Sequence, residues 1–314
     1  MSSLQEQGPD SEFHDTKRRS LIHRLYSLLT LNVPDTPCYT VAQSFWGAIW
    51  LCDLEKLEEI TRFAETASLS MIESIRKDAL LEGSILIHYL IMLPDPVPYG
   101  SQARQACHAR DNGTCVITND SSTVKQVYII PMKGNPVLKV FDPYSWMHLF
   151  WTPSRVNEWK DIISTKNEID VCENMITMSP SLFSLWKKCL FALKPLEVSP
   201  DKKSMEVQFF WLQKLQKRAG GINFGRRPKS LLPADPKGHS EEFSSENVQT
   251  ICSGAKFTLQ TDDPENKPLP SKELLELHWI LHRLLALSGT RVRSGDSDDE
   301  DEVDFTDSED EHFD

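Results

Sequence analysis

The sequence predicts an α+β protein, in which a helical region precedes a ββα core with a helical insertion, a strand and helix extension and an acidic tail. Apolar residues recur at helical spacing through residues 16–93. Two short strand-like stretches bounded by Asn, Asp, Gly and Ser follow within residues 115–130. Residues 296–314 hold twelve Asp and Glu and no Lys or Arg, so we expect the tail at residues 292–314 to be disordered.

Composition sets limits on the rest of the chain. A chain of 314 residues with 39% hydrophobic residues, 8 Trp and 14 Phe can fill a sizeable core. The formal net charge is −12, from 46 acidic and 34 basic residues. Because twelve acids lie in residues 296–314, the remaining 34 balance the 34 Lys and Arg. The acidity therefore belongs to the tail, and the folded part is close to neutral.

Cysteine usage and the N-terminus indicate an intracellular protein. The seven cysteines form no C-x-x-C pair, which argues against a disulfide framework and a two-knuckle zinc site. The N-terminus is polar, without the apolar stretch of a secretory signal. The longest apolar run, residues 85–93, is too short to cross a bilayer. We expect a protein of the cytoplasm or nucleus that is not secreted and binds no membrane.

The N-terminal region divides into a disordered start at residues 1–15 and a helical part at residues 16–93. Ser70 and Glu73 have the spacing of a capping box and predict a helix start. PDPVPYG at residues 94–100 ends the helices and predicts a linker between domains. The apolar faces expected to line the core are Leu21, Leu25, Leu28 and Leu29, then Phe45, Trp46, Ile49 and Trp50.

Residues 101–195 are predicted to form the second domain, built around a hairpin. A short helix leads into the turn residues Asp111, Asn112 and Gly113. The expected strands are residues 115–118 and 124–130, joined by a turn at residues 119–121. Ser179 followed by Pro180 predicts the start of the helix that completes the ββα unit.

Several separated motifs of this part resemble the HNH nuclease family. The hairpin is similar to R-D-x-x-x-C-V-x-T-G followed by A-H-I-I-P, and the stretch from Asn174 is similar to N-x-I-x-L-S-x-x-x-H-x-x-W … F-A-L-K-P. Residues 253–287 resemble the C-terminal signature of the same branch, so the similarity covers about residues 104–288. The insertion of fungal members, W-x-x-x-F-W … V-x-x-W, is matched by Trp146, Phe150, Trp151, Val156 and Trp159.

The resemblance implies a phosphodiesterase site whose reactive side chains are replaced. In that family a strand histidine activates water, an asparagine orients the loop and a helix histidine holds a divalent metal. The alignment puts Tyr128 at the base position and Phe183 at the metal-ligand position, and keeps Asn174. A tyrosine with a pKa of roughly 10 is a poor base near neutrality, and phenylalanine has no donor atom. We expect Asn174 to bridge backbone groups across a loop, a role that needs no catalysis.

The sequence leads us to expect one of three functions, and the first two follow from the HNH resemblance. The first is a degenerate HNH-like module that binds nucleic acid or protein without cleaving it and needs no cofactor. The second is a divergent DNA endonuclease using Mg, Mn or Zn, in which His108 or, in preference, His148 would approach the vacant site in place of the lost histidines. A zinc site from Cys107, His108, Cys115 and Cys172 is a further alternative, although its spacing matches no structural zinc pattern.

Residues 196–291 are predicted to supply partners and packing rather than chemistry. Alternating Met205, Val207, Phe209 and Trp211 predict a strand, and Ser271 and Gly289 bracket a final helix with inward leucines. A Gly-containing loop between them suits either phosphate binding or a solvated surface. Its cations are Lys214, Lys217, Arg218, Arg226, Arg227 and Lys229.

The acidic tail supports a third function, an interaction protein for basic partners such as histones. Ser297, Thr306 and Ser308 each precede an acid by three residues, which is the pattern of an acidophilic kinase site. Phosphate there would add negative charge. The tail is therefore expected either to bind a basic protein or to compete with DNA for the basic loop.

Overall fold

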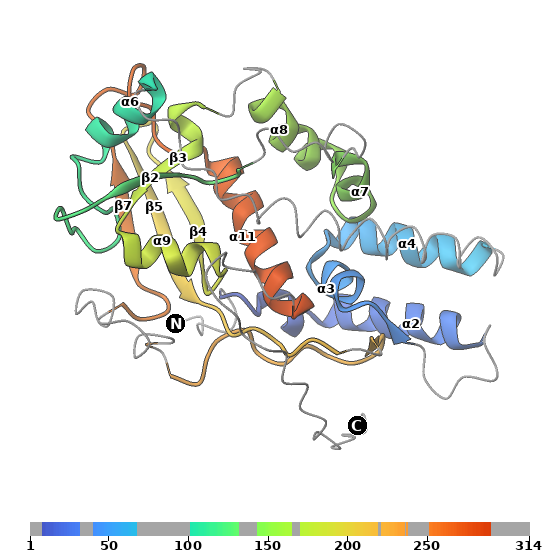
Figure 1. Cartoon of the computed structure of the whole chain (residues 1–314). Helices are drawn as coiled ribbons and strands as arrows, with labels where there is room; N and C mark the ends of the chain where they lie inside the picture. Colours follow the sequence, from blue (N-terminus) through green and yellow to red (C-terminus); the bar gives the residue numbers. More distant parts are fainter. Residues whose placement is uncertain are drawn as a thin grey trace.

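The protein is described by a computed structural model covering residues 8–31, 40–67, 101–131, 143–164, 170–218, 221–235, 237 and 251–289. Helices combine with small antiparallel sheets, which confirms the predicted α+β class (Figure 1). The predicted capping box at Ser70 and Glu73, the linker at residues 94–100 and the tail at residues 292–314 lie outside the described residues.

The N-terminal region is helical as expected. It contains the short η1 (Ser11–His14) and the helices α2 (Thr16–Leu31), α3 (Gln43–Leu51) and α4 (Leu54–Thr66). α2 packs along α4, and α3 packs against α11 (Lys272–Ser288). The predicted faces point inward: Leu25, Leu29, Trp46, Ile49 and Trp50 are buried, while Leu21, Leu28 and Phe45 are half-buried.

Residues 8–15 correct the prediction of a disordered N-terminus. Phe13 is 2% exposed and packs edge-on against Trp50, with ring centroids 5.9 Å apart. Glu12 accepts a hydrogen bond from the buried Arg283 at 2.7 Å. Local polarity does not reveal this order, because one aromatic side chain and one distant arginine supply it.

The hairpin is also different from the predicted one. β2 (Lys125–Tyr128) pairs antiparallel with β3 (Met175–Met178), with Tyr128 opposite Met175. Residues 115–118 form a turn instead of a strand, since Asn119 N donates to Cys115 O at 2.8 Å. Residues 115–118 lie between two turn-forming sequences, and so short a segment forms a turn more readily than an extended strand. The strand that pairs with β2 is therefore β3, which follows the insertion in the chain.

A helix stands on each side of this β2–β3 ribbon (Figure 1). α6 (Gln102–Arg110) contacts both strands from one side, and α9 (Pro180–Lys187) contacts β2 from the other. The Ser179 side chain caps α9 and Pro180 opens it, as predicted. The 3-10 turn η3 (Cys172–Asn174) leads directly into β3.

The insertion forms two helices, α7 (Pro143–Phe150) and α8 (Pro153–Ser164). Its five motif residues are all buried: Trp146, Phe150, Trp151, Val156 and Trp159. The four aromatic rings contact one another in tilted and edge-on arrangements, with ring centroids 4.8 Å apart for Trp146 and Phe150 and 6.0 Å apart for Trp151 and Trp159. This aromatic packing gives the residues of the pattern a role in the core.

The second sheet has the order β4-β5-β7, formed by Phe191–Val198, Ser204–Trp211 and Lys256–Gln260. α11 packs on β4, capped by Ser271 and ended by Gly289 in the left-handed conformation, as predicted. A two-stranded ribbon joins β1 (Thr40–Val41) to β6 (Ile222–Asn223).

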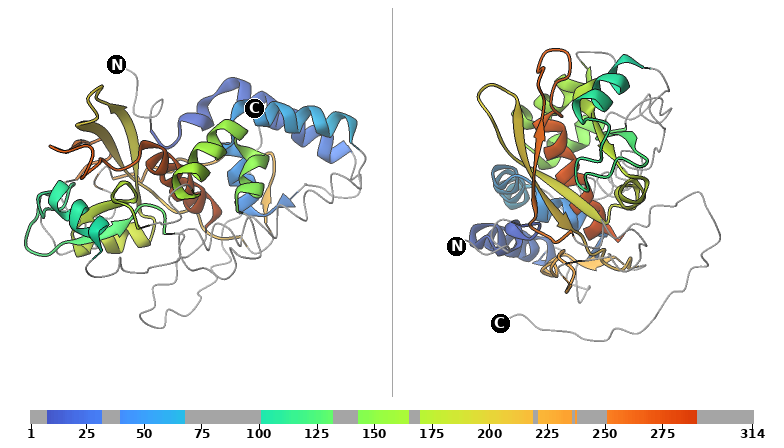
Figure 2. Two further views of the ribbon diagram at one scale, coloured as in Figure 1. Left: turned by 90° about the horizontal axis from the view of Figure 1, so that it is seen from above. Right: turned by 90° about the vertical axis from the view of Figure 1, so that its left-hand side faces the viewer.

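α11 is the central element of the molecule. It lies between the sheet and ribbon on one side and the helices on the other (Figure 2). One continuous cluster of buried side chains runs from Phe13 to Leu287 and includes residues of every predicted folded region. No helix among the described residues has the length and apolar character to cross a membrane.

Candidate functional site

Asn174 joins the start of β3 to the residues that follow β2. Its Oδ1 accepts a hydrogen bond from Ile130 N at 2.9 Å, and its Nδ2 donates to Ile130 O at 3.0 Å. The side chain is 2% exposed. The amide thus acts as a peptide-like partner for a strand end. The predicted bridging role of Asn174 is confirmed.

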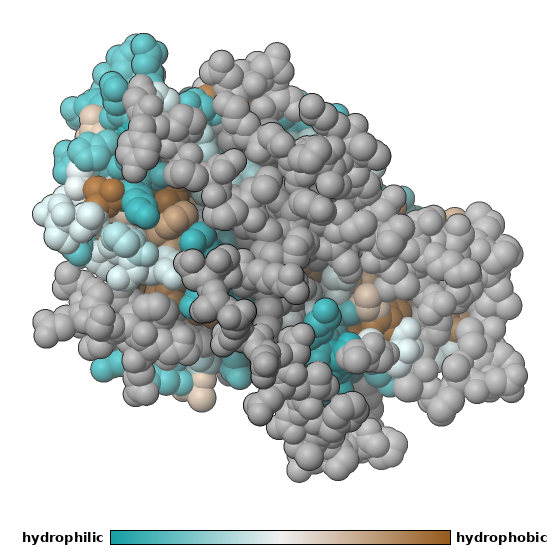
Figure 3. All heavy atoms as spheres, viewed as in Figure 1, coloured by the Kyte–Doolittle hydropathy of each residue, from teal (hydrophilic) through white to brown (hydrophobic). Residues whose placement is uncertain are grey.

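Tyr128, at the position aligned with the general base, lies on the α6 side of the ribbon. Its ring packs with Cys107, Cys172 and Met175 and is 7% exposed. Its hydroxyl donates to Asp170 Oδ1 at 3.1 Å. The outward face of α6, above this cluster, is hydrophilic (Figure 3). In this contact the phenol is a hydrogen-bond donor, whereas a general base must accept a proton.

Phe183, at the aligned metal-ligand position, lies on the α9 side. It is half-buried against the main core, and its ring has Lys125 Nζ at 5.8 Å and Lys187 Nζ at 5.2 Å. Side chains alternate between the two faces of a strand, so Val127 faces the main core with Phe183 while Tyr128 faces α6. The two aligned positions therefore lie on opposite faces of the ribbon.

A buried ion pair occupies the α6 side instead. Arg110 Nε donates to Asp111 Oδ1 at 2.8 Å, and the exposed fractions of the two side chains are 0% and 4%. The remaining guanidinium donors reach the carbonyls of Cys172, Met175 and Pro268 at 2.8–3.0 Å. Asp111 Oδ2 accepts from the backbone N of Thr177 at 3.0 Å.

This pair joins α6, η3, β3 and the segment before α11. Such a fully bonded buried pair organises the fold, because loss of either partner leaves a buried charge. The sequence motif contained both residues, but Asp111 was assigned only to a turn and Arg110 was given no role. Their adjacency at the end of a helix, just before a turn, was the available signal.

The four residues of the alternative zinc site do not come together. Cys107 and Cys172 both contact the Arg110 guanidinium. Cys115 belongs to the separate main core, and the His108 ring rests over Gly113. Across the described residues, no three His, Cys, Asp or Glu side chains form a metal-binding group.

The two thiols beside Arg110 are held in their neutral form. Burial raises the pKa of Cys107, although the charge of Arg110 opposes the shift. Burial also raises the pKa of Cys172 to about 11. Since the thiolate is the nucleophile and metal ligand, these cysteines are packing residues near neutral pH.

His148 does not approach the ribbon. It lies on α7, which packs against α3, α4 and α8. α11 stands between these helices and β2 in the views of Figures 1 and 2. The aromatic packing of the insertion orients it toward the N-terminal helices, so the expected approach of His148 to the ribbon is wrong.

The six basic residues predicted to bind phosphate divide into two groups. Lys217, Arg218, Arg227 and Lys229 are exposed, and we call them the basic surface. Arg226 and Lys214 are half-buried. Lys214 lies inward, near two buried groups: burial raises the pKa of Cys189 and the charge of Lys214 opposes that rise, while burial lowers the pKa of His282 and Lys214 adds to the fall. Residues 213–234 contain six cations and no Asp or Glu.

Buried contacts hold the loop that carries the basic surface. Trp46 Nε1 donates to Arg226 O at 2.9 Å, and Asp10 Oδ1 accepts from Leu231 N at 2.8 Å. A Cβ on Gly221, which has a φ of 80°, would lie 2.6 Å from Val41 O, so the β1–β6 pairing requires glycine there. The exposed cations thus project from an anchored backbone.

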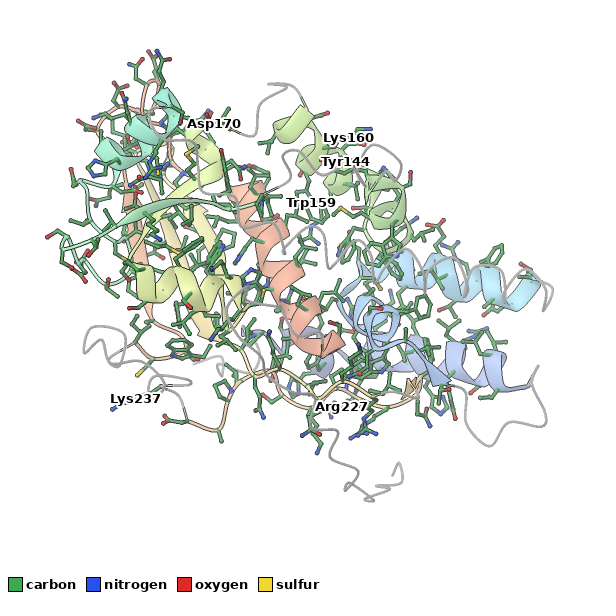
Figure 4. All side chains as sticks on the ribbon, viewed as in Figure 1. Tyr144, Trp159, Lys160, Asp170, Arg227 and Lys237 are labelled. Atoms are coloured by element: carbon green, nitrogen blue, oxygen red, sulfur yellow. The ribbon has the colours of Figure 1, made fainter. Side chains whose placement is uncertain are left out.

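His14 adds a group to this surface that sequence reasoning missed. Arg227 donates from its guanidinium to His14 Nδ1 at 3.0 Å, and both residues are exposed. The two residues are far apart in the chain, so no local pattern relates them. Figure 4 shows Arg227 far from Asp170, which marks the Tyr128 side of the ribbon.

A buried histidine pair on α11 was also missed. His278 stacks on Trp186 with ring centroids 3.7 Å apart, and His282 Nδ1 lies 2.7 Å from Phe191 O. Both histidines are 2% exposed. Burial lowers the pKa of each: that of His282 falls to about 3, and that of His278 falls well below 6.5. Their i, i+4 spacing inside an apolar helix was the available signal.

The predicted phosphorylation positions Ser297, Thr306 and Ser308 lie outside the described residues. The described chain therefore offers two distinct features: a β2–β3 ribbon packed between α6 and α9, and an anchored basic surface away from it. No protein-family model, curated protein or solved structure matches this chain, so its residues and geometry carry the functional argument.

Proposed function

We propose that this protein is a non-hydrolysing module with an HNH-like ββα unit, and that it binds nucleic acid through the phosphates. The basic surface carries this proposal: four exposed cations project from an anchored loop without a neighbouring acid in its sequence. Cations placed this way neutralise phosphates and release counterions, which is the main source of sequence-independent affinity.

The ββα unit supports a binding role over a catalytic one. β2, β3 and α9 succeed one another as two paired strands and a helix, although β3 is not the strand that the resemblance implies, and Asn174 lies at the strand junction. Tyr128 and Phe183 lie on opposite faces, and each is held in its own apolar packing. A hydrolytic site needs a base and a metal aimed at one phosphate. The proposed module uses the ribbon as scaffold and takes no cofactor.

The direct test compares two variants that each remove four charges. The basic-surface variant is K217Q/R218Q/R227Q/K229Q, and the control variant is K125Q/K160Q/K203Q/K256Q, at exposed positions on other elements. Fluorescence anisotropy with a labelled DNA oligonucleotide, at several salt concentrations, measures binding. We expect the basic-surface variant to bind at least about ten-fold more weakly, with a salt slope reduced by about 3–4.

The control variant should change the affinity much less. Equal losses in the two variants would show that only overall charge matters and would contradict the proposed surface. Absence of DNA binding by the wild-type chain and by its tail-neutralised form, described below, would overturn the nucleic-acid function.

The endonuclease alternative has one structural observation in its favour, the Asp170 carboxylate beside the Tyr128 hydroxyl. A plasmid-nicking assay with Mg²⁺, Mn²⁺ or Zn²⁺ tests it. We expect no nicking above the background of the Tyr128→Phe variant. Metal-dependent nicking that disappears in Tyr128→Phe would replace our proposal with the enzyme.

The third function, binding of basic proteins such as histones, depends on the acidic tail. Pull-down with histones, using wild-type and tail-neutralised chains, separates this function from DNA binding. All three functions suit a protein of the cytoplasm or nucleus, and the proposed DNA ligand favours the nucleus.

A further inference from the structure

The described chain ends against the backbone that carries the basic surface. Gly289, which ends α11, has a φ of 65°, and a Cβ on it would lie 2.7 Å from Lys217 N and 2.8 Å from Leu215 O. Leu215 N donates to Ala286 O at 2.9 Å. Gly289, the C-cap of α11, is therefore in direct contact with the segment that displays Lys217 and Arg218.

α3 fixes both parts of the basic surface relative to this end. Gln43 Nε2 donates to Gln216 O at 2.9 Å and to Leu287 O at 3.4 Å, while its Oε1 accepts from Arg218 N at 2.7 Å. One turn later, Trp46 donates to Arg226 O. Consecutive turns of α3 thus hold the end of α11 beside Lys217 and Arg218 and bind the backbone just before Arg227. Figure 4 shows Arg227 below that end of α11.

The segment that follows has the opposite charge. Residues 296–314, here called the acidic segment, contain twelve Asp and Glu and no Lys or Arg. Asp296 follows Gly289 by seven residues, which in extended form span at most about 25 Å. The acidic segment therefore begins within reach of Lys217, and its length allows it to pass Arg227.

We propose that the acidic segment of this chain binds the basic surface of the same molecule and competes there with nucleic acid. The competition rests on the proposed function, whereas the intramolecular contact does not. Tethering gives the segment an effective concentration on the order of millimolar, so weak surface charge pairs suffice for occupancy. Salt screens such pairs within about 10 Å, and the contact is therefore salt-sensitive.

Cross-linking tests the contact without nucleic acid. Carbodiimide joins carboxylates to lysines, and peptide mass spectrometry of the monomer identifies the pairs. We expect the acidic segment to link to Lys217 and Lys229, and these links to fade at about 1 M salt. Lys160 and Lys203 are the internal controls, being exposed on other elements. Equal linking to all four lysines, or none to Lys217 and Lys229, would overturn the proposal.

A charge cycle tests the competition in the full chain. The tail-neutralised form replaces all twelve acids of the acidic segment by Asn or Gln. We expect this change to raise DNA affinity at least about ten-fold in the wild-type background and in the control variant. The gain should shrink in the basic-surface variant, since the competing contact is already lost. An equal gain in all three backgrounds would reduce the effect to net charge and contradict competition.

The two proposals fail in different ways. Specific links to Lys217 and Lys229 without DNA binding by the tail-neutralised form would leave the contact and remove the nucleic-acid function. Equal DNA binding with and without the twelve acids, and no such links, would leave the DNA function and remove the contact.

Discussion

At the residue scale, Asn174 shows how a motif residue can hold a strand end in place. Its amide satisfies both the N–H and the C=O of Ile130 in a buried position. The resemblance drew attention to this residue for its place in a nuclease motif. Its hydrogen bonds account for its presence without any substrate, because buried peptide groups require partners.

Asn174→Ala should destabilise the protein by about 2–4 kcal/mol, since it leaves two buried backbone groups without this partner. Urea unfolding followed by tryptophan fluorescence measures the change. Asn266→Ala is the matched control, because Asn266 is exposed and bonds Asp263 at the surface. We expect that control to stay within about 0.5 kcal/mol of the wild type. A wild-type stability for Asn174→Ala would contradict the bridging role.

The buried histidines predict loss of stability in mild acid. Their folded pKa values lie below the ordinary 6.5, so the folded state binds fewer protons than the unfolded state. Stability from the neutral rings is complete above pH 6.5 and is lost as the pH falls toward the folded pKa values. Each histidine then contributes up to about 1.4 kcal/mol per pH unit.

His278→Phe keeps a ring against Trp186 and removes one titrating group. Between pH 6.5 and 5, the free energy of unfolding of this variant should fall less steeply with acid than that of the wild type. Asn157→Gln is the control, since Asn157 is exposed and does not titrate, and it should leave the slope unchanged. An identical slope in His278→Phe and wild type would show that His278 does not titrate on unfolding.

At the element scale, the end of α11 depends on a residue without a side chain. Gly289 has a positive φ, and its neighbours within 3 Å of an added Cβ are all backbone atoms of residues 215–217. Gly113 has a similar φ of 63°, but its neighbour is the His108 ring, which can move. Alanine variants at the two positions therefore distinguish the cost of the left-handed backbone from the cost of close packing.

Gly289→Ala and Gly113→Ala should each lower the free energy of unfolding by about 1–2 kcal/mol, because both positions have a left-handed backbone. Gly289→Ala should lower the free energy of unfolding by about 1–3 kcal/mol more, because the backbone of residues 215–217 has to shift. Thermal and urea unfolding of the two variants measure the difference. Equal losses would show that α11 does not end in close contact with the basic loop.

Elements with local signals were predictable, and elements with distant partners were not. Ser179 and Pro180 identified the start of α9, and Ser271 and Gly289 identified both ends of α11. The partner of β2 was assigned to the nearest strand-like stretch, whereas β3 lies beyond two helices of the insertion. Strand pairing is decided by burial of the ribbon between α6 and α9, which no local pattern records.

At the scale of the whole molecule, one core connects segments from both ends of the described chain. Phe13 packs on Trp50, and Glu12 pairs with Arg283 of α11. α11 touches α3, α8 and β4. This arrangement favours one cooperative unfolding transition, in which the N-terminal segment participates.

Phe13→Ala should lower the free energy of unfolding by about 3–5 kcal/mol, as expected for a buried aromatic ring. Tryptophan fluorescence and far-UV circular dichroism should report the same shifted transition. Phe63→Ala is the control, because Phe63 is 37% exposed, and should change stability by no more than about 0.5 kcal/mol. A separate early transition for the N-terminal segment would contradict a single cooperative core.

The sequence by itself determined the α+β class, the helices with strong caps, the strand at Ser204–Trp211 and the charge contrast between the loop and the acidic segment. These features depend on residue order over short distances. Tertiary structure alone decided the β2–β3 pairing, the buried Arg110–Asp111 pair and the separation of Tyr128 from Phe183. It also decided that α11 ends beside the basic surface. Those outcomes depend on which distant groups share a buried space, because burial and hydrogen bonding there outweigh local preference.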